Sequence, residues 1–173
     1  RILADILESY RGSQAIVMAI PAGGLPVAEP IARGLDLPLD VAVVSKITPP
    51  WNSEVGYGAI AFDGTAVLNR DLLSHFDLSQ EELQRGFDKT ERKVARRMET
   101  LRGGRPMPDL TGRTVILVDD GIASGYTLRA AAKAMRKFDV ATLVCAVPTA
   151  HRESIDEFLD QVDVLYCPNV RSG

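Results

Sequence analysis

The sequence predicts an α/β fold, with a five-stranded parallel sheet, helices on both faces and a small hood made of a hairpin and a helix. Short, nearly continuous apolar runs, which suit strands buried on both faces, alternate with segments whose apolar residues recur at helical spacing. A length of 173 residues suits one domain with a sizeable core. We therefore expect a single domain over residues 1–173, with its core in residues 14–50 and 111–168 and its hood in residues 51–110.

The first part of the chain predicts two core strands separated by a helix. Apolar residues at helical spacing before residue 11 indicate an opening helix. The apolar run Gln14–Ile20 predicts the first strand, which Pro21–Gly24 breaks. Leu25–Gly34 follows as a helix, and Asp40–Ile47 predicts the second buried strand.

A loop and a hairpin come next. Thr48–Gly58 is rich in turn-forming residues and predicts a loop. Tyr57–Phe62 and Thr65–Asn69 flank the pair Asp63-Gly64, which is a strong hairpin pattern. These segments form the first part of the expected hood.

A long helix completes the hood. It begins near Gln80, where Asp77 or Ser79 can cap its first turn. Its second half and the residues after it are basic, and we interpret them as a solvated face with i,i+4 ion pairs. The basic residues are Arg92, Lys93, Arg96, Arg97, Arg102 and Arg105.

The remaining segments alternate regularly between strand and helix. Arg113–Val118, Val140–Val147 and Val162–Tyr166 predict strands, and Tyr126–Phe138 and His151–Asp160 predict helices. The flavodoxin-like order 2-1-3-4-5 places the first strand beside the third. Ligands bind such sheets beyond the carboxyl ends of the strands, where the order reverses. The loops after the first and third strands therefore border the expected site.

The loop after the third strand has the composition of a binding site for a phosphorylated sugar. The small residues of Gly121–Gly125 let the backbone approach a ligand, and the following helix N-terminus attracts phosphate. Ser124 and Thr127 add hydroxyl donors. Two carboxylates, Asp119 and Asp120, precede this loop and can accept hydrogen bonds from a vicinal diol. A ribose 5-phosphate satisfies both halves of the loop.

Two other interpretations remain open at this point. The loop can be an ordinary strand-to-helix turn with an incidental acidic pair. It can also belong to an acidic metal pocket of the receiver-domain kind, but such a pocket needs another acidic residue at the end of a strand. The first strand ends instead in Ile20-Pro21.

Val115–Thr127 closely resembles the phosphoribosyl pyrophosphate (PRPP) signature of type I phosphoribosyltransferases. The resemblance implies that Asp119 and Asp120 are catalytic residues that hold the ribose hydroxyls, and that they hold Mg²⁺ indirectly, through these hydroxyls or water. Many members have Gly where this chain has Tyr126, so the tyrosine ring must point away from the phosphate. The resemblance implies these substrate-binding residues in the loop: Gly121, Ile122, Ala123, Ser124, Gly125, Tyr126 and Thr127.

The loop after the first strand is similar to the pyrophosphate loop of the same family, which often contains a non-proline cis peptide bond. The resemblance implies that Ala22, Gly23 and Gly24 bind the diphosphate. A wider pattern from about Gln14 to Pro148 resembles a subgroup of small predicted phosphoribosyltransferases with no assigned base. That subgroup commonly has Arg at the position of Ala22, so this chain lacks one cation at the diphosphate.

Lys46 and Glu54 complete the predicted site. Lys46 ends the second predicted strand beside the same crevice, where it can neutralise diphosphate as a catalytic residue or remain a solvated lysine. Glu54 lies in Thr48–Gly58, which resembles the family's flexible catalytic loop and implies a substrate-binding role. Trp51 lies in the same loop, and we interpret it as a packing residue rather than one that stacks on the base.

These observations predict an enzyme that transfers the 5-phosphoribosyl group between PRPP and a nitrogenous base, with Mg²⁺ as cofactor. We also expect a homodimer. A net charge of −3 and the absence of a long apolar run argue against nucleic-acid and membrane partners. Cys145 and Cys167 lie on apolar stretches without metal-ligand spacing, and we expect a cytoplasmic location. The first alternative is a non-catalytic regulatory protein that binds PRPP or a nucleotide, and the second is an α/β domain for another phosphorylated sugar.

Overall fold

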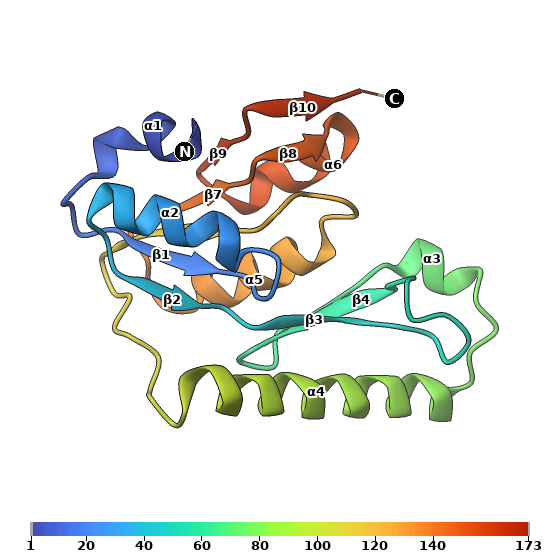
Figure 1. The fold of residues 1–173 in the computed structure, drawn as a ribbon. Helices are drawn as coiled ribbons and strands as arrows, with labels where there is room; N and C mark the ends of the chain where they lie inside the picture. The colour runs from blue at the N-terminus through green and yellow to red at the C-terminus, as the bar shows by residue number, and fades with distance from the viewer. Residues whose placement is uncertain (1, 173) are drawn as a thin grey trace.

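The computed structural model describes residues 2–172 and has the predicted α/β architecture (Figure 1). All neighbours in its five-stranded sheet are parallel, in the order β2-β1-β6-β7-β9. The predicted order, in which the first and third core strands are neighbours, is therefore confirmed. The strands of this sheet are β1 (Ile16–Ala19), β2 (Leu39–Val41), β6 (Thr114–Val118), β7 (Thr142–Ala146) and β9 (Val164–Tyr166).

Helices cover both faces of this sheet because alternate residues of each buried strand point to opposite sides. Val17 and Ile116 pack on the face covered by α1 and α2, whereas Met18 and Leu117 pack on the face covered by α5 and α6. The helices are α1 (Ile2–Ile6), α2 (Leu25–Leu35), α5 (Tyr126–Arg136) and α6 (Arg152–Phe158), with short 3₁₀ turns at Glu8–Tyr10 and Leu159–Gln161.

The prediction of one continuous strand over Asp40–Ile47 is wrong. This segment contains the end of β2 and all of β3 (Val44–Ile47), which belong to different sheets. The backbone N–H of Ala42 still donates to the carbonyl oxygen of Ala19, and then the chain leaves the core sheet. From Val44 onward it pairs with the hairpin instead. Both sheets surround this segment with apolar residues, so the periodicity of the sequence does not show where one strand ends and the next begins.

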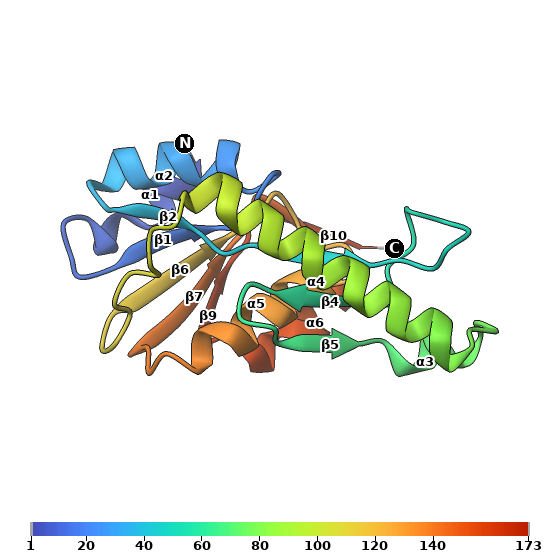
Figure 2. The same cartoon turned by 90° about the horizontal axis from the view of Figure 1, so that it is seen from below.

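The hood contains the predicted hairpin and the predicted long helix. β3, β4 (Gly58–Ala61) and β5 (Ala66–Leu68) form an antiparallel sheet, and α4 (Gln80–Arg102) runs along it (Figure 2). Ser79 caps α4 through a capping box with Glu82. A short helix, α3 (Arg70–Ser74), lies between β5 and α4 and was not predicted.

The hairpin tip is fixed to the C-terminal end of α5. The ammonium group of Lys137 donates to the hydroxyl of Thr65 at 2.6 Å and lies 3.6 Å from the carboxylate of Asp63. The rings of Phe62 and Phe138 also pack together, with their centroids 5.9 Å apart. The tip of the hood hairpin therefore contacts the end of α5 in the core, which is far from the hairpin in the sequence.

The interpretation of the basic residues as a solvated face is wrong for Arg102. Its side chain is buried, forms an ion pair with Asp40 and donates to the backbone carbonyl of Pro106 at 2.6 Å. Within residues 2–172 no ion pair joins two residues of α4, so the expected i,i+4 pairs are not seen either. Asp40 lies at the edge of the core sheet, and the pairing attaches the end of α4 there.

A second small sheet was not predicted. β8 (Thr149–His151) and β10 (Asn169–Arg171) pair in parallel, just after the ends of β7 and β9. They extend the carboxyl edge of the core sheet beside the loop that follows β6, where Ile122 forms an isolated bridge to Ala150. Strands of three residues leave almost no periodic pattern in the sequence.

Candidate functional site

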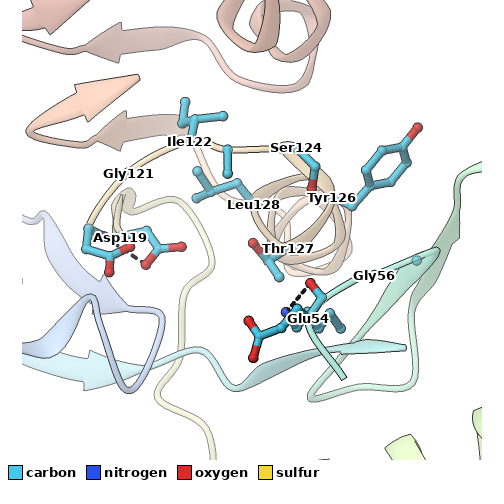
Figure 3. Close-up of a pocket in the computed structure, with 14 residues that line it drawn as sticks. Glu54, Gly56, Asp119, Gly121, Ile122, Ser124, Tyr126, Thr127 and Leu128 are labelled. Carbon is cyan, nitrogen blue, oxygen red and sulfur yellow. Dashed lines mark hydrogen bonds between the residues drawn. The ribbon is translucent and has the colours of Figure 1, made fainter. Parts of the chain in front are cut away.

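A cavity of about 330 Å³ lies at the carboxyl end of β6 (Figure 3). Its walls come from the loop between β6 and α5 and from the hood. They contain both predicted acidic residues, the predicted loop residues Gly121–Thr127, and Lys46 and Glu54. The structure therefore brings together these predicted site residues from segments more than sixty positions apart, and it adds Gly56, Gly58 and Leu128.

The backbone of the loop is arranged to receive an anion. Within residues 2–172 no acceptor meets the backbone N–H groups of Ala123, Ser124, Gly125, Tyr126 or Thr127. Gly125 adopts a left-handed conformation, with a φ of 84°, at the start of α5. Unpaired N–H groups at the N-terminus of an eleven-residue helix carry partial positive charge and favour a phosphate group.

Asp119 is buried at the edge of this cavity, with 9% of its surface exposed. Burial, with a smaller contribution from the neighbouring charge of Asp120, raises the pKa of its carboxyl group to about 7. The hydrogen bond from the backbone N–H of Asp120 to Oδ1 of Asp119, 2.8 Å long, opposes this rise in pKa. Asp119 therefore changes its charge near neutral pH, where a carboxylate is normally fully ionised.

The loop after β1 packs against the acidic pair. The peptide bond between Pro21 and Ala22 is cis. A Cβ atom added to Gly23 would lie 2.8 Å from Cγ of Asp120, and one added to Gly24 would lie 2.5 Å from the carbonyl oxygen of Val118. Only glycine fits at both positions. Ala22, Gly23 and Gly24 do not line the cavity itself, but Gly23 contacts its acidic wall at Asp120 from the side of β1.

Lys46 holds the hood loop in its present position. Its ammonium group donates to the backbone carbonyl of Glu54 at 2.8 Å, while the backbone N–H of Glu54 donates to the side chain of Asn52 at 2.9 Å. Trp51, in the same loop, is 58% exposed and packs edge-on against Phe76 at a centroid distance of 5.4 Å. The choice between packing and stacking on a base stays a prediction for this exposed ring.

The ring of Tyr126 points away from Thr127 and Asp119, as its position in the loop requires (Figure 3). The guanidinium group of Arg129 lies 5.0 Å from the centre of the ring and also donates to the carbonyl oxygen of Glu157. This cation–π contact holds the phenol outside the loop. Tyr126 can therefore replace glycine without filling the space in front of the N–H groups.

A second cavity of about 210 Å³ shares Asp120 and Gly121–Ala123 with the first, and sequence reasoning missed it. Its other walls come from β8 and β10, with Thr149, His151 and Arg171 among the lining residues. In the sequence, this cavity was indicated only by the polar residues that follow the fourth and fifth predicted strands. Periodicity does not show that two such ends meet.

The model of the phosphoribosyl transferase domain family matches residues 1–169. This chain belongs to the phosphoribosyl transferase family. Two sequences from strains of Mycobacterium tuberculosis, each named "Putative phosphoribosyl transferase", are 38% identical to it over 173 aligned residues. The alignment covers 96% of this chain but 38% of each relative, so the chain spans well under half the length of these proteins. The "Bifunctional protein PyrR" of Trichormus variabilis is 32% identical, with 88% of this chain and 67% of that protein aligned.

Solved structures agree with the family assignment. The crystal structure of TT1426 from Thermus thermophilus is 32% identical, with a TM-score of 0.75 over 98% of this chain and 80% of that chain. A purine phosphoribosyltransferase from Pyrococcus horikoshii is 16% identical, with a TM-score of 0.53 over 99% of this chain and 82% of that chain. The second similarity shows a shared fold. In the part of the chain that the structure describes, no helix is long and apolar enough to cross a membrane.

Proposed function

We propose that this phosphoribosyl transferase domain transfers the 5-phosphoribosyl group between PRPP and a nitrogenous base, with release of diphosphate. One observation carries the proposal: the unpaired backbone N–H groups of residues 123–127 lie beside the carboxylates of Asp119 and Asp120 in one cavity. The N–H groups suit a 5-phosphate, and the carboxylates suit the ribose hydroxyls. A phosphate site alone does not account for two carboxylates.

The other loop residues add to the two halves of this site. Ser124 and Thr127 donate hydroxyl hydrogen bonds to the phosphate oxygens, whereas Gly121 and Ile122 let the backbone pass close to the ribose. Asp119 and Asp120 accept hydrogen bonds from the two ribose hydroxyls. Charged acceptors make stronger hydrogen bonds than neutral ones, so this pair fixes the orientation of the sugar.

The acidic pair also fits Mg²⁺ that arrives with PRPP. Within residues 2–172 no group of three or more His, Cys, Asp or Glu side chains could hold a metal ion alone. Mg²⁺ commonly binds through one or two carboxylates, several waters and the phosphates of a substrate. Asp119 and Asp120 would hold it indirectly, through water or the ribose hydroxyls, and the bound ion would neutralise the charge of the leaving diphosphate.

The diphosphate is proposed to lie toward the β1 side of the acidic pair. The backbone of Ala22, Gly23 and Gly24 borders that side, and glycine allows the close approach of a phosphate. Lys46 would exchange its hydrogen bond to the Glu54 carbonyl for one to the diphosphate. The loop that contains Glu54 would then close over PRPP and exclude water from the reacting carbon.

The acceptor base is proposed to enter from the opposite side. β6 lies between β1 and β7, so the glycine loop after β1 and the second cavity after β7 flank Asp120 from opposite directions. A base nitrogen in the second cavity attacks the anomeric carbon with its lone pair, and the base loses its N–H proton to water or to the departing diphosphate. The carbon–oxygen bond to diphosphate breaks, and its electron pair leaves with diphosphate. Positioning and charge neutralisation supply the rate enhancement, and no covalent enzyme intermediate is needed.

Diphosphate release tests this proposal. The protein is incubated with PRPP, Mg²⁺ and a panel of purine and pyrimidine bases, and base-dependent diphosphate release is the expected result. The double variant Asp119→Asn/Asp120→Asn should lose it, whereas Lys133→Met on the exposed surface of α5 should not. If PRPP does not bind, or if the double variant behaves like the parent protein, the proposal is wrong.

One observation favours a second candidate function, a non-catalytic protein that binds PRPP or a nucleotide. This chain has Ala22 at a position where the subgroup that it resembles commonly has Arg. The diphosphate side of the proposed site therefore lacks one cation. The same assay distinguishes the two functions, because saturable binding of PRPP without turnover of any base supports the regulatory protein.

A further inference from the structure

The second cavity contains hydrogen-bond donors that the protein itself leaves unused. The hydroxyl oxygen of Thr149 is buried and has no hydrogen-bond partner within the described residues. Arg171 pairs with His151 across the small parallel sheet; its side chain is exposed, and its guanidinium group makes no ion pair or side-chain hydrogen bond with residues 2–172. A buried hydroxyl without a partner is costly, so a ligand that supplies a partner to Thr149 gains affinity, while the exposed guanidinium group of Arg171 is free to turn toward the same ligand.

The kind of donor restricts the ligand. A guanidinium group has five N–H donors and accepts no hydrogen bond, so it suits a carbonyl oxygen and opposes an exocyclic amino group. The hydroxyl of Thr149 can donate to the same type of oxygen, but it can also accept, so the distinction between the two groups rests mainly on Arg171. Asp120 is the one carboxylate that lines this cavity within residues 2–172, and it also lines the first cavity, where the ribose hydroxyls would occupy it. With Asp120 occupied by the ribose, no carboxylate among the described residues that line this cavity is left to accept a hydrogen bond from an amino group.

We infer that Arg171 and Thr149 select a base that presents a carbonyl oxygen over one that presents an amino group at the same position. The inference rests on the proposed function, because it requires the base to occupy the second cavity while the ribose 5-phosphate occupies the first. Arg171 and Thr149 are then specificity-determining residues for the acceptor, and the residues that hold the phosphate and ribose take no part in the choice.

Matched nucleotides test this selection without any need for turnover. Inosine and adenosine 5′-monophosphate differ by a carbonyl or an amino group on the purine, and uridine and cytidine 5′-monophosphate differ in the same way on the pyrimidine. Calorimetry gives the Kd of each, with ribose 5-phosphate as the reference for the sugar-phosphate half. In each pair we expect the carbonyl nucleotide to bind at least about tenfold more tightly, the effect of one hydrogen bond to a charged group.

Variants connect this difference to the two residues. Arg171→Leu should reduce the preference in both pairs to about twofold or less, and Thr149→Val, which keeps the side-chain volume, should weaken it. Both should leave the affinity for ribose 5-phosphate unchanged. Arg152→Leu is the control, because it removes the same charge next to His151 from a residue that does not line the cavity.

The outcomes separate this inference from the proposed function. If ribose 5-phosphate does not bind, both are wrong. If ribose 5-phosphate binds but the paired nucleotides bind equally, or the amino member binds more tightly, the selection is wrong and the transferase proposal stands. A preference that survives Arg171→Leu together with Thr149→Val shows that other residues read the base, which also overturns the inference.

Discussion

Gly23, after the first strand of the core sheet, touches the carboxylate of Asp120, after the neighbouring strand β6. No side chain fits between them, because a Cβ atom on Gly23 would lie 2.8 Å from Cγ of Asp120. The two loops at the point where the strand order reverses are therefore adjusted to one another. This contact joins the proposed diphosphate side to the proposed ribose side, and a change in one must displace the other.

The first prediction follows from this contact. Gly23→Ala should displace the Asp120 carboxylate and lower the affinity for PRPP by about tenfold or more, the effect of losing a charge-assisted hydrogen bond. Calorimetry with PRPP and Mg²⁺ measures the change. Gly34→Ala is the matched control, because its nearest neighbour would be the Ala4 side chain at 3.6 Å. It should bind PRPP normally and gain up to about 1 kcal/mol of stability in helix α2. Equal affinities for the two variants would contradict the prediction.

Asp119 should make ribose 5-phosphate binding depend on pH near neutrality. Its raised pKa of about 7 means that it is ionised above this pH and neutral below it, and the neutral group is a weaker acceptor that also carries an O–H donor. Between pH 8 and pH 6 the affinity should fall about tenfold through this group. The ligand's phosphate also titrates in this range, so the comparison is with Asp119→Asn, which retains only that part of the dependence. Parallel pH profiles for the two proteins would rule out the assignment.

The same pKa predicts the direction of a stability change. Since the folded state holds the Asp119 proton up to about pH 7 and the unfolded chain releases it near the ordinary Asp pKa of 3.8, this group lowers the free energy of unfolding as pH rises between these values. Asp119→Asn cannot ionise and avoids this loss. It should therefore be more stable than the parent protein at pH 8, by about 2 to 4 kcal/mol, and similar to it at pH 4. Denaturant unfolding at both pH values measures the difference, and a variant that is less stable at pH 8 would refute the prediction.

Lys46 should affect the diphosphate and leave the ribose phosphate unchanged. Lys46→Met removes the ammonium group, so the affinity for PRPP should fall by about ten- to a hundredfold while that for ribose 5-phosphate stays the same. Lys133→Met removes an equivalent charge from an exposed site outside the cavity and serves as the control. Equal losses for both ligands would mean that Lys46 supports the loop through its bond to Glu54 and does not bind diphosphate.

Arg102 should be important for stability and not for binding. Arg102→Met leaves Asp40 without its partner at the edge of the core sheet, and losing one member of a buried ion pair costs about 3 to 5 kcal/mol. Replacing Asp40 by Asn in the same protein should recover part of this loss, since no unpaired charge then remains. Arg96→Met on the exposed side of α4 should change the free energy of unfolding by less than about 0.5 kcal/mol. An equal loss of stability in Arg102→Met and Arg96→Met would contradict this role of the ion pair.

The sequence predicted those parts of the molecule in which one local pattern has one structural meaning. The apolar runs defined the core strands and their order, and the pair Asp63-Gly64 defined the hairpin. Val115–Thr127 was recognisable because a strand, two carboxylates and a small-residue loop occur together. The cavity that contains this segment agrees with the prediction, although the roles of the individual residues remain proposals.

The parts that were missed depend on contacts between distant segments. Asp40–Ile47 has the pattern of one strand because both sheets bury it equally. Only the pairing partners show that the segment belongs to two strands in different sheets. The local sequence predicts that Arg102 is a surface cation, because its partner, Asp40, lies sixty-two positions away in the chain. Thr149 and Arg171 are each unremarkable in sequence, and their shared cavity exists only because two three-residue strands pair at the carboxyl edge.

Helix α5 has different attachments at its two ends. Its first residues carry the N–H groups that are proposed to receive the phosphate, and just beyond its last turn Lys137 and Phe138 hold the tip of the hood hairpin. A helix of eleven residues is a stiff rod about 16 Å long. A small tilt of this helix when phosphate binds at its first turn would move the hairpin tip at its other end. The hood would then respond to an occupied phosphate site, although its tip lies a full helix length away from that site.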